Sequence, residues 1–209
     1  MDWGRRAVAR AYAASASGYA ERFGDEFVTN DFDRDVLRRF LEPLLRESTV
    51  LDGGCGPGQI AKVVEERGLH AVGVDITMDM LSIARNRLAA PHVACGDLCE
   101  LPFPGAVFDA VVCWFSVHNL PRQLMPALLA EVRRVLIIGG RVLFATHEGS
   151  TEERFTDDAG ETFAFTYYRD VELAGLLEDA GFASVVAEVR QPFDGEHQVQ
   201  KLFASAITT

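Results

Sequence analysis

The stretch LDGGCGPGQIAK, from Leu51 to Lys62, is the feature that most constrains this chain. Glycine takes four of the six positions from 53 to 58, between an apolar run and a segment with helical spacing. Chains gather glycines in this way where the backbone comes close to a ligand. In open α/β sheets, ligands bind beyond the carboxyl ends of the strands, where a strand-to-helix loop lies. The stretch therefore predicts an α/β fold with a ligand at this loop.

The segments around this loop alternate between patterns typical of strands and of helices. Strands are expected at 49–52, 70–75, 92–95, 108–115 and 141–146, and helices at 59–67, 78–88 and 124–136. The fourth strand is nearly all apolar, which is typical of a strand buried on both faces. This alternation predicts a parallel sheet with right-handed crossovers.

The two ends of the chain depart from the alternation. Residues 7–20 and 32–45 have helical spacing and precede the first strand. After a helix at 171–179, strands at 185–190 and 199–207 flank a turn-rich segment. That spacing predicts an antiparallel hairpin at the edge of the sheet. With no repeat and no second core, we expect one domain over 1–209.

Composition and charge exclude several classes of protein. The chain has 209 residues, of which 48% are hydrophobic, enough for one globular core. Its formal net charge of −11 argues against a nucleic-acid partner, and no apolar run approaches the roughly 20 residues of a membrane span. The four cysteines lack the spacing of a disulfide framework or a zinc site. We therefore expect a cytoplasmic protein with reduced thiols and no metal.

Three ligands could explain the glycine loop. A nucleoside triphosphate needs the pattern G-x-x-x-x-G-K-[ST]. Residues 53–58 have the glycine spacing, but Gln59 and Ile60 stand where Lys and Ser or Thr are required. A dinucleotide needs G-x-G-x-x-G/A, which residues 56–61 match, with Asp75 in the place of the ribose-binding acid.

The third ligand is S-adenosylmethionine, which carries adenosine but no phosphate. Its methionine part is a zwitterion beside a positive sulfonium. Asp52, just ahead of the glycines, would attract the ammonium group and repel a pyrophosphate. This asymmetry favours S-adenosylmethionine over a dinucleotide.

Five segments resemble, in order, the motifs of the class I S-adenosylmethionine-dependent methyltransferases, in particular the small bacterial-type members with a methyltransferase domain of the 11/25 kind. They are 50–58 (VLDGGCGPG), 72–75 (VGVD), 95–98 (CGDL) with 101–104 (LPFP), 108–118 (FDAVVCWFSVH) and 133–144 (RRVLIIGGRVLF). Gly53 departs from the family by replacing a usual apolar residue. Ile137 and Ile138 also depart from its usual pattern, at a surface turn. The resemblance implies a Rossmann-like, doubly wound sheet of seven strands in the order 3-2-1-4-5-7-6, with an antiparallel C-terminal hairpin.

The resemblance also implies a set of cofactor-binding residues. Asp75 matches the acid that binds the ribose hydroxyls, and Asp97 matches the acid that meets the adenine amine. The full expected set is Tyr19, Asp52, Gly54, Cys55, Gly56, Gly58, Asp75, Ile76, Met80, Asp97, Leu98, Cys113, Trp114 and Phe115.

Residues for the methyl acceptor are expected at the strand ends and in the N-terminal helix. His118 and His147 follow the fourth and fifth strands and are the candidate bases, although His118 could instead orient its loop. The expected substrate contacts are Tyr12, His147, Glu148 and Tyr168. We expect residues 1–46 to form a helical lid and residues 147–168 a substrate-side insertion, although this insertion could instead be an edge strand. For Tyr12, simple packing is the alternative interpretation.

We therefore predict a methyltransferase (EC 2.1.1) that acts on an oxygen or nitrogen atom of a small metabolite, as a monomer or homodimer. Methyl transfer needs no catalytic triad, because the cofactor already activates the methyl group. Two alternatives stay open. One is a non-catalytic or regulatory protein that binds S-adenosylmethionine, and the other is a dinucleotide-dependent oxidoreductase.

Overall fold

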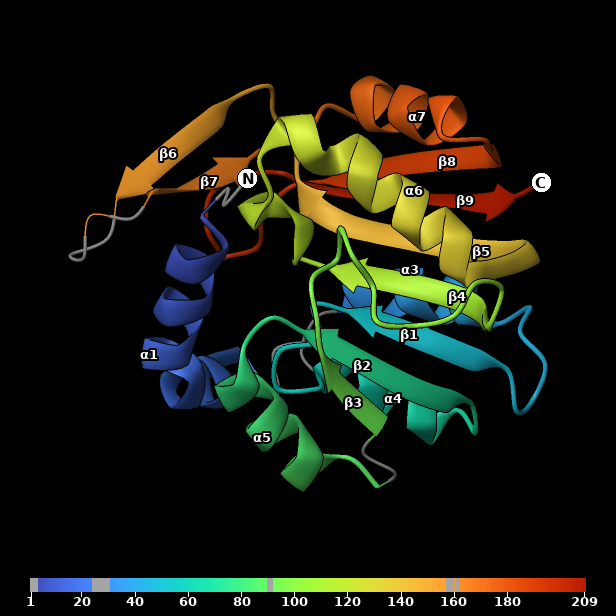
Figure 1. The fold of residues 1–209 in the computed structure, drawn as a ribbon. Helices are drawn as coiled ribbons and strands as arrows, with labels where there is room; N and C mark the ends of the chain where they lie inside the picture. Colours follow the sequence, from blue (N-terminus) through green and yellow to red (C-terminus); the bar gives the residue numbers. More distant parts are fainter. Residues whose placement is uncertain (1–3, 24–30, 90–91, 157–159, 161) are drawn as a thin grey trace.

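Seven strands form the central sheet in the order β3-β2-β1-β4-β5-β9-β8 (Figure 1). The computed structural model describes residues 4–23, 31–89, 92–156, 160 and 162–209. The strands of this sheet are β1 (Thr49–Gly53), β2 (His70–Asp75), β3 (His92–Cys95), β4 (Phe108–Trp114), β5 (Leu136–His147), β8 (Phe182–Arg190) and β9 (Lys201–Thr208).

The strand order confirms the prediction. Counted along the chain within this sheet, the order is 3-2-1-4-5-7-6. Strands β3, β2, β1, β4 and β5 pair in parallel, whereas β9 pairs antiparallel with both β5 and β8. The parallel strands therefore end at one edge of the sheet, where the glycine loop follows β1.

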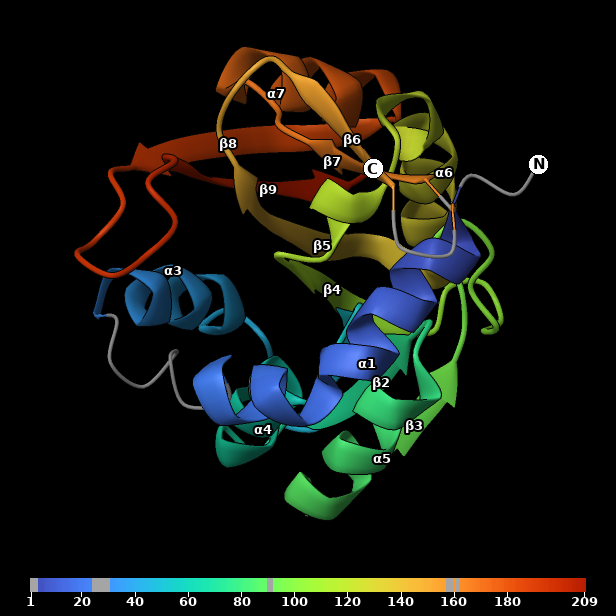
Figure 2. The same cartoon turned by 90° about the vertical axis from the view of Figure 1, so that its left-hand side faces the viewer.

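Helices cover both faces of the sheet. Its apolar residues pack against α3 and α4 on one face and against α6 and α7 on the other, so that the core lies in two layers (Figures 1 and 2). The described helices are α1 (Arg5–Phe23), α3 (Asp31–Leu41), α4 (Gln59–Glu66), α5 (Met78–Arg87), α6 (Met125–Val135) and α7 (Asp170–Asp179), with short 3-10 helices η1 (Val117–Asn119) and η2 (Arg122–Leu124).

Strand β5 is longer than the sequence pattern indicated. It begins at Leu136 rather than at residue 141. Leu136 pairs with Phe108, and the pairing resumes only between Arg141 and Ala110, because a bulge separates the two registers. Gly139 has a φ of 76° in this bulge, a left-handed conformation that glycine adopts without strain.

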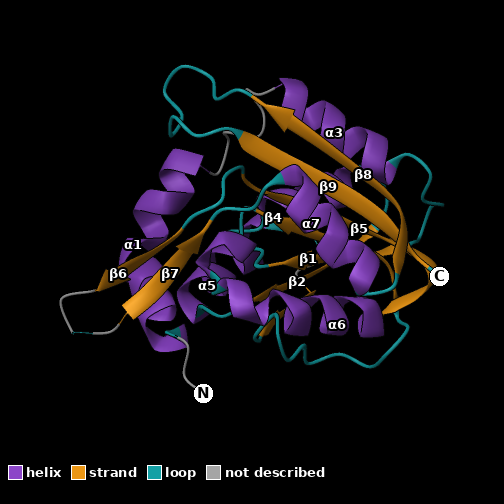
Figure 3. Ribbon diagram, turned by 90° about the horizontal axis from the view of Figure 1, so that it is seen from above, coloured by secondary structure: helices purple, strands orange, loops and turns teal. Residues whose placement is uncertain are grey.

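A second, two-stranded sheet lies outside the main one. It is the antiparallel pair β6 (Glu152–Thr156) and β7 (Thr162–Thr166), inserted between β5 and α7. Strand β7 contacts both α1 and η1, and Figure 3 shows the pair beside α1. The insertion expected at 147–168 thus contains a hairpin, and residues 157–159 and 161 of it lie outside the described residues.

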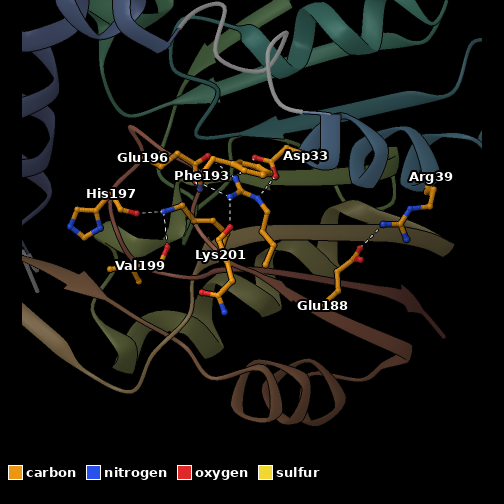
Figure 4. Close-up of polar contacts among 10 residues, drawn as sticks. Asp33, Arg39, Glu188, Phe193, Glu196, His197, Val199 and Lys201 are labelled. Carbon is orange, nitrogen blue, oxygen red and sulfur yellow. Dashed lines mark hydrogen bonds and ion pairs between the residues drawn. The ribbon is translucent and has the colours of Figure 1, made fainter.

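Helix α3 is tied to the C-terminal strands by a buried ion-pair cluster (Figure 4). Arg190 donates to Asp33 Oδ1 and Oδ2 at 2.7 and 2.8 Å, and to Glu196 Oε2 and Oε1 at the same two distances. The three side chains are 6%, 9% and 13% exposed. Near them, Lys201 Nζ donates to the carbonyl oxygens of His197 and Val199. The cluster fixes the loop between β8 and β9 against the start of α3.

Candidate functional site

A cavity that opens to solvent lies at the carboxyl ends of β1, β2 and β4. Helix α1 runs across this end of the sheet (Figure 2) and contributes residues to the cavity wall. Thirteen of the residues expected from the sequence line the cavity: Tyr12, Tyr19, Asp52, Gly54, Cys55, Gly56, Asp75, Ile76, Met80, Asp97, Leu98, Trp114 and Phe115.

The four glycines of the loop differ in what a side chain at their position would meet. A Cβ at position 53 would lie 2.9 Å from Cys113 Sγ, and one at position 54 would lie 2.3 Å from Ser116 Cβ. Gly58 has a φ of 84° at the start of α4. Only at Gly56, whose φ is 50°, would a Cβ meet no atom within 4 Å. Gly56 is therefore the glycine of the four that leaves space open at the cavity.

Asp75 holds the loop in place from the end of β2. Its Oδ2 accepts a hydrogen bond from the Gly56 amide and its Oδ1 accepts one from the Thr77 amide, both at 2.8 Å. Burial raises the pKa of Asp75, and these backbone donors partly oppose the shift. The carboxylate lines the cavity between the glycine loop and the start of α5.

Asp52 is almost fully buried, with 2% of its surface exposed. Its Oδ2 accepts a hydrogen bond of 3.0 Å from the Ala61 amide in the first turn of α4. Burial raises the pKa of Asp52 to about 7, against the lowering effect of this hydrogen bond. The Asp52 carboxyl group is therefore close to half ionised at neutral pH in the protein without a bound cation.

Asp97, which follows β3, is the third carboxylate residue of the cavity wall. Its Oδ1 accepts a hydrogen bond of 2.7 Å from the Cys99 amide. Its Oδ2 lies 2.6 Å from Nε of Arg5, which belongs to α1. This ion pair connects the N-terminal helix to the loop that follows β3.

Aromatic rings line the cavity towards α1 and the end of β4. Tyr12 and Tyr19 lie edge to face, with ring centroids 5.9 Å apart, and Trp114 and Phe115 do so at 5.8 Å. Burial raises the pKa of Tyr12, so its hydroxyl stays protonated at neutral pH. This aromatic end of the cavity can hold a flat or apolar molecule and keep water out.

His118 and His147 do not line the cavity, whereas Phe115, which is next to His147, does. Their ring centroids are 5.2 Å apart, and His147 lies 5.3 Å from Phe115. Both side chains are buried, and burial lowers the pKa of His118 to about 4 and that of His147 to about 2. Both histidines are therefore neutral at pH 7 and can accept as well as donate hydrogen bonds. Their expected catalytic role stays a prediction.

Four other residues expected at the site do not line the cavity: Gly58, Cys113, Glu148 and Tyr168. Cys113 packs in the core beneath the glycine loop, and Tyr168 is fully buried in the core layer next to α6 and α7. Glu148 follows β5, where its amide donates to the Gln200 carbonyl. Gly58 and Cys113 lie within the first and fourth motifs, whereas Glu148 and Tyr168, expected as substrate contacts, lie outside the motifs.

The sequence reasoning missed several cavity residues. Asn119 and Leu120 follow the fourth motif, and Ser116 lies within it. Val8 lies one helical turn before Tyr12 on α1, so the spacing of i and i+4 could have suggested it. The remaining missed residues are Pro57, Gln59, Ile60, Thr77 and Gly96.

Among the described residues, no cluster of three or more His, Cys, Asp or Glu side chains has the arrangement of a metal site. Likewise, no described helix has both the length and the apolar character needed to span a membrane.

Comparisons with known proteins agree with this geometry. Residues 51–144 match the model of a methyltransferase domain family. The chain is 35% identical over 143 residues to a malonyl-[acyl-carrier protein] O-methyltransferase of Serratia marcescens, covering 67% of this chain and 55% of that protein. It is 26% identical to an uncharacterized methyltransferase of Geobacillus kaustophilus, over 86% and 87% of the two chains. The chain spans about half the length of the curated malonyl-[acyl-carrier protein] O-methyltransferases that it matches.

Solved structures share the fold. Phosphoethanolamine N-methyltransferase 2 of Haemonchus contortus, solved with S-adenosyl-L-methionine, superposes with a TM-score of 0.77 at 18% identity, over 98% of this chain and 60% of that one. The 1,6-didemethyltoxoflavin-N1-methyltransferase of Burkholderia thailandensis gives a TM-score of 0.70 at 20% identity, over 98% and 90%. With its motifs, sheet order and relatives in agreement, the chain belongs to the class I S-adenosylmethionine-dependent methyltransferase family.

Proposed function

We propose that this protein transfers a methyl group from S-adenosylmethionine to an oxygen or nitrogen atom of a small molecule. The observation that carries the proposal is the row of three carboxylates, Asp52, Asp75 and Asp97, along the ends of β1, β2 and β3 in one cavity. A zwitterionic adenosyl amino acid offers an ammonium, ribose hydroxyls and an adenine amine. Each of these groups donates hydrogen bonds, and a carboxylate accepts them.

The residues present fit such a cofactor. Asp52 would receive the ammonium, Asp75 the ribose hydroxyls and Asp97 the adenine amine. Gly56 leaves the backbone accessible at the cavity, which opens to solvent. When bound, the cofactor supplies a methyl group that its sulfonium has already activated.

The contribution of the chain to the reaction is positioning. An acceptor atom has to be held about 3 Å from the methyl carbon and in line with the bond that breaks. The rings of Tyr12, Tyr19, Trp114 and Phe115 form a wall that can orient an acceptor and exclude water. The neutral state of His118 and His147 keeps positive charge away from this wall.

A dinucleotide fits less well, for a reason that the structure adds. A pyrophosphate would need the free amides at the start of α4. The Ala61 amide in that first turn already donates to Asp52. Because a carboxylate occupies the place that a phosphate would take, an oxidoreductase is the weaker candidate.

Relatives leave several acceptors open. The malonyl-[acyl-carrier protein] O-methyltransferases support transfer to oxygen, and the N-methyltransferases with a similar fold support transfer to nitrogen. The net charge of −11 disfavours a nucleic-acid acceptor.

The first experiment is a calorimetric titration of the purified protein with S-adenosylmethionine, S-adenosylhomocysteine and NADH. The proposal expects micromolar binding of the two adenosyl amino acids and no binding of NADH. Asp75→Ala should weaken S-adenosylhomocysteine binding by at least about 1 kcal/mol, as the loss of a charge-assisted hydrogen bond does. The control is Asp79→Ala, which removes an exposed carboxylate from α5.

Three outcomes would count against the proposal. Binding of NADH alone would favour the oxidoreductase. An unchanged affinity of Asp75→Ala would remove Asp75 from the site. Cofactor binding without release of S-adenosylhomocysteine, across a panel of phenols, amines and carboxylic acids, would favour a regulatory protein.

A further inference from the structure

Asn119 links the N-terminal helix to His118 through a single amide group. It is the last residue of η1, lines the cavity and is 8% exposed. Its Nδ2 atom donates to the hydroxyl oxygen of Tyr12 at 2.8 Å and lies 3.2 Å from Nε2 of His118. Tyr12 and Asn119 are 107 positions apart in the sequence.

The chemistry of the amide fixes the roles of both partners. An amide nitrogen has two hydrogens and only donates, so Tyr12 Oη and His118 Nε2 both accept. His118 must then carry its hydrogen on Nδ1. That Nδ1 atom is buried and makes no hydrogen bond to the described residues. The hydroxyl hydrogen of Tyr12 is not used in its contact with Asn119.

This arrangement bears on where a proton of the acceptor can go. Nε2 of His118 is engaged by Asn119, so it is not available to take a proton from an acceptor. Tyr12 lines the cavity, and its hydroxyl hydrogen can be donated to a molecule there.

We propose that Asn119 is a positioning residue that holds His118 as the Nδ1–H tautomer and sets the Tyr12 hydroxyl as a hydrogen-bond donor to the methyl acceptor. This inference rests on the proposed methyl transfer for the identity of the molecule in the cavity. It requires an acceptor with an oxygen or nitrogen lone pair next to its reactive atom. It also gives His118 an orienting role in place of that of a base.

The tautomer can be measured without any ligand. Nitrogen-15 NMR of the imidazole side chains at pH 7, with His118 assigned by the loss of its signals in His118→Gln, distinguishes a protonated nitrogen from an unprotonated one. The proposal expects a protonated Nδ1 and an unprotonated Nε2 in the wild type. A wild-type protein with hydrogen on Nε2 would overturn it, whether or not any variant folds.

Variants then test whether Asn119 is the cause. Asn119→Ala should let the Nε2–H tautomer of His118 gain population, whereas Asn86→Ala, the same change at an exposed position of α5, should not. Thermal unfolding of both variants checks that the fold is retained. An unchanged His118 tautomer in a folded Asn119→Ala protein would also overturn the proposal.

The link to α1 is tested by a double-mutant cycle on S-adenosylhomocysteine dissociation. Tyr12→Phe and Asn119→Ala remove the same hydrogen bond, so each should speed dissociation about fivefold, and the double variant should be no faster than the quicker single variant. Rate effects that multiply in the double variant would show that the two residues act separately. If the wild type binds neither adenosyl compound, the proposed function fails, and the NMR measurement still decides the role of Asn119.

Discussion

Arg5 in α1 and Asp97 after β3 form an ion pair, with 2.6 Å between Arg5 Nε and Asp97 Oδ2. Asp97 is also the carboxylate proposed to receive the adenine amine. One acidic side chain in the cavity wall is therefore paired with α1 and, under the proposed function, would also contact the ligand. The proposed function therefore predicts that α1 and the cofactor are coupled through Asp97.

Arg5→Gln should loosen α1 without unfolding the protein. The Arg5 side chain is 38% exposed, and such partly exposed pairs contribute at most about 1 kcal/mol. We expect S-adenosylhomocysteine to dissociate up to about fivefold faster in stopped-flow measurements, with the melting temperature nearly unchanged. The neighbouring exposed Arg6 provides the control as Arg6→Gln. Equal dissociation rates for wild type and Arg5→Gln would show that the ion pair does not hold the helix.

Cofactor affinity should depend on the ionisation of Asp52. Burial raises the pKa of this carboxyl to about 7, and only its ionised form attracts an ammonium group. Affinity for S-adenosylhomocysteine should therefore fall as the pH drops through 7, by about tenfold between pH 8 and pH 6. Calorimetry in buffers of different ionisation enthalpy should also detect proton release on binding near neutral pH.

Asp52→Asn is the control for this pH dependence. The amide keeps the shape and can still accept from the Ala61 amide, but it has no charge to lose. Its affinity should be low and nearly constant between pH 6 and pH 8. A variant that keeps the full tenfold dependence would assign the effect to a different group.

Two glycines of the loop should respond differently to alanine. At position 54 the new Cβ would lie 2.3 Å from Ser116 Cβ, so Gly54→Ala should destabilise the fold by several kcal/mol in urea unfolding. At Gly56 the Cβ meets open space, so only the left-handed backbone costs about 1 kcal/mol. Ser116→Gly should partly restore the Gly54→Ala protein. Equal losses at both positions would contradict the packing explanation.

The cluster around Arg190 should matter far more than its surface counterpart. Arg190→Met removes the guanidinium that bridges the buried carboxylates of Asp33 and Glu196, and breaking a buried ion pair in this way typically costs about 3–5 kcal/mol. Arg39→Met breaks the exposed pair with Glu188, which joins the same helix α3 and strand β8 and contributes at most about 1 kcal/mol. Urea unfolding of the two variants compares them directly. Similar losses would mean that the buried cluster is not what holds α3.

The sheet and most of the cavity wall around the glycine loop could be predicted because short stretches of sequence indicate them. The strands show as apolar runs, and the glycine loop, Asp75 and Asp97 stand within short motifs. Cys113 shows the limit of such patterns. It belongs to the correct motif, but successive residues of a strand face opposite sides, and its side chain packs in the core while Trp114 lines the cavity.

The aromatic end of the cavity could be predicted less well, because contacts between residues far apart in the sequence form it. Nothing near Asn119 in the sequence indicates that its partner is Tyr12, more than one hundred residues earlier. The lid expected at 1–46 is described only in part: α1 and α3 are, but residues 1–3 and 24–30 lie outside the described residues. Its role over the cavity stays a proposal, as do the catalytic and substrate roles of His147, Glu148 and Tyr168.

The separate sheet of β6 and β7 gives this architecture freedom to change over evolution. Its two strands pair with each other rather than with the seven-stranded sheet, so gaining or losing residues in this hairpin leaves the register of the main strands intact. The same hairpin contacts α1 and η1, beside the aromatic end of the cavity. Descendants of one ancestral chain could therefore diversify at this hairpin while inheriting an unaltered row of carboxylates.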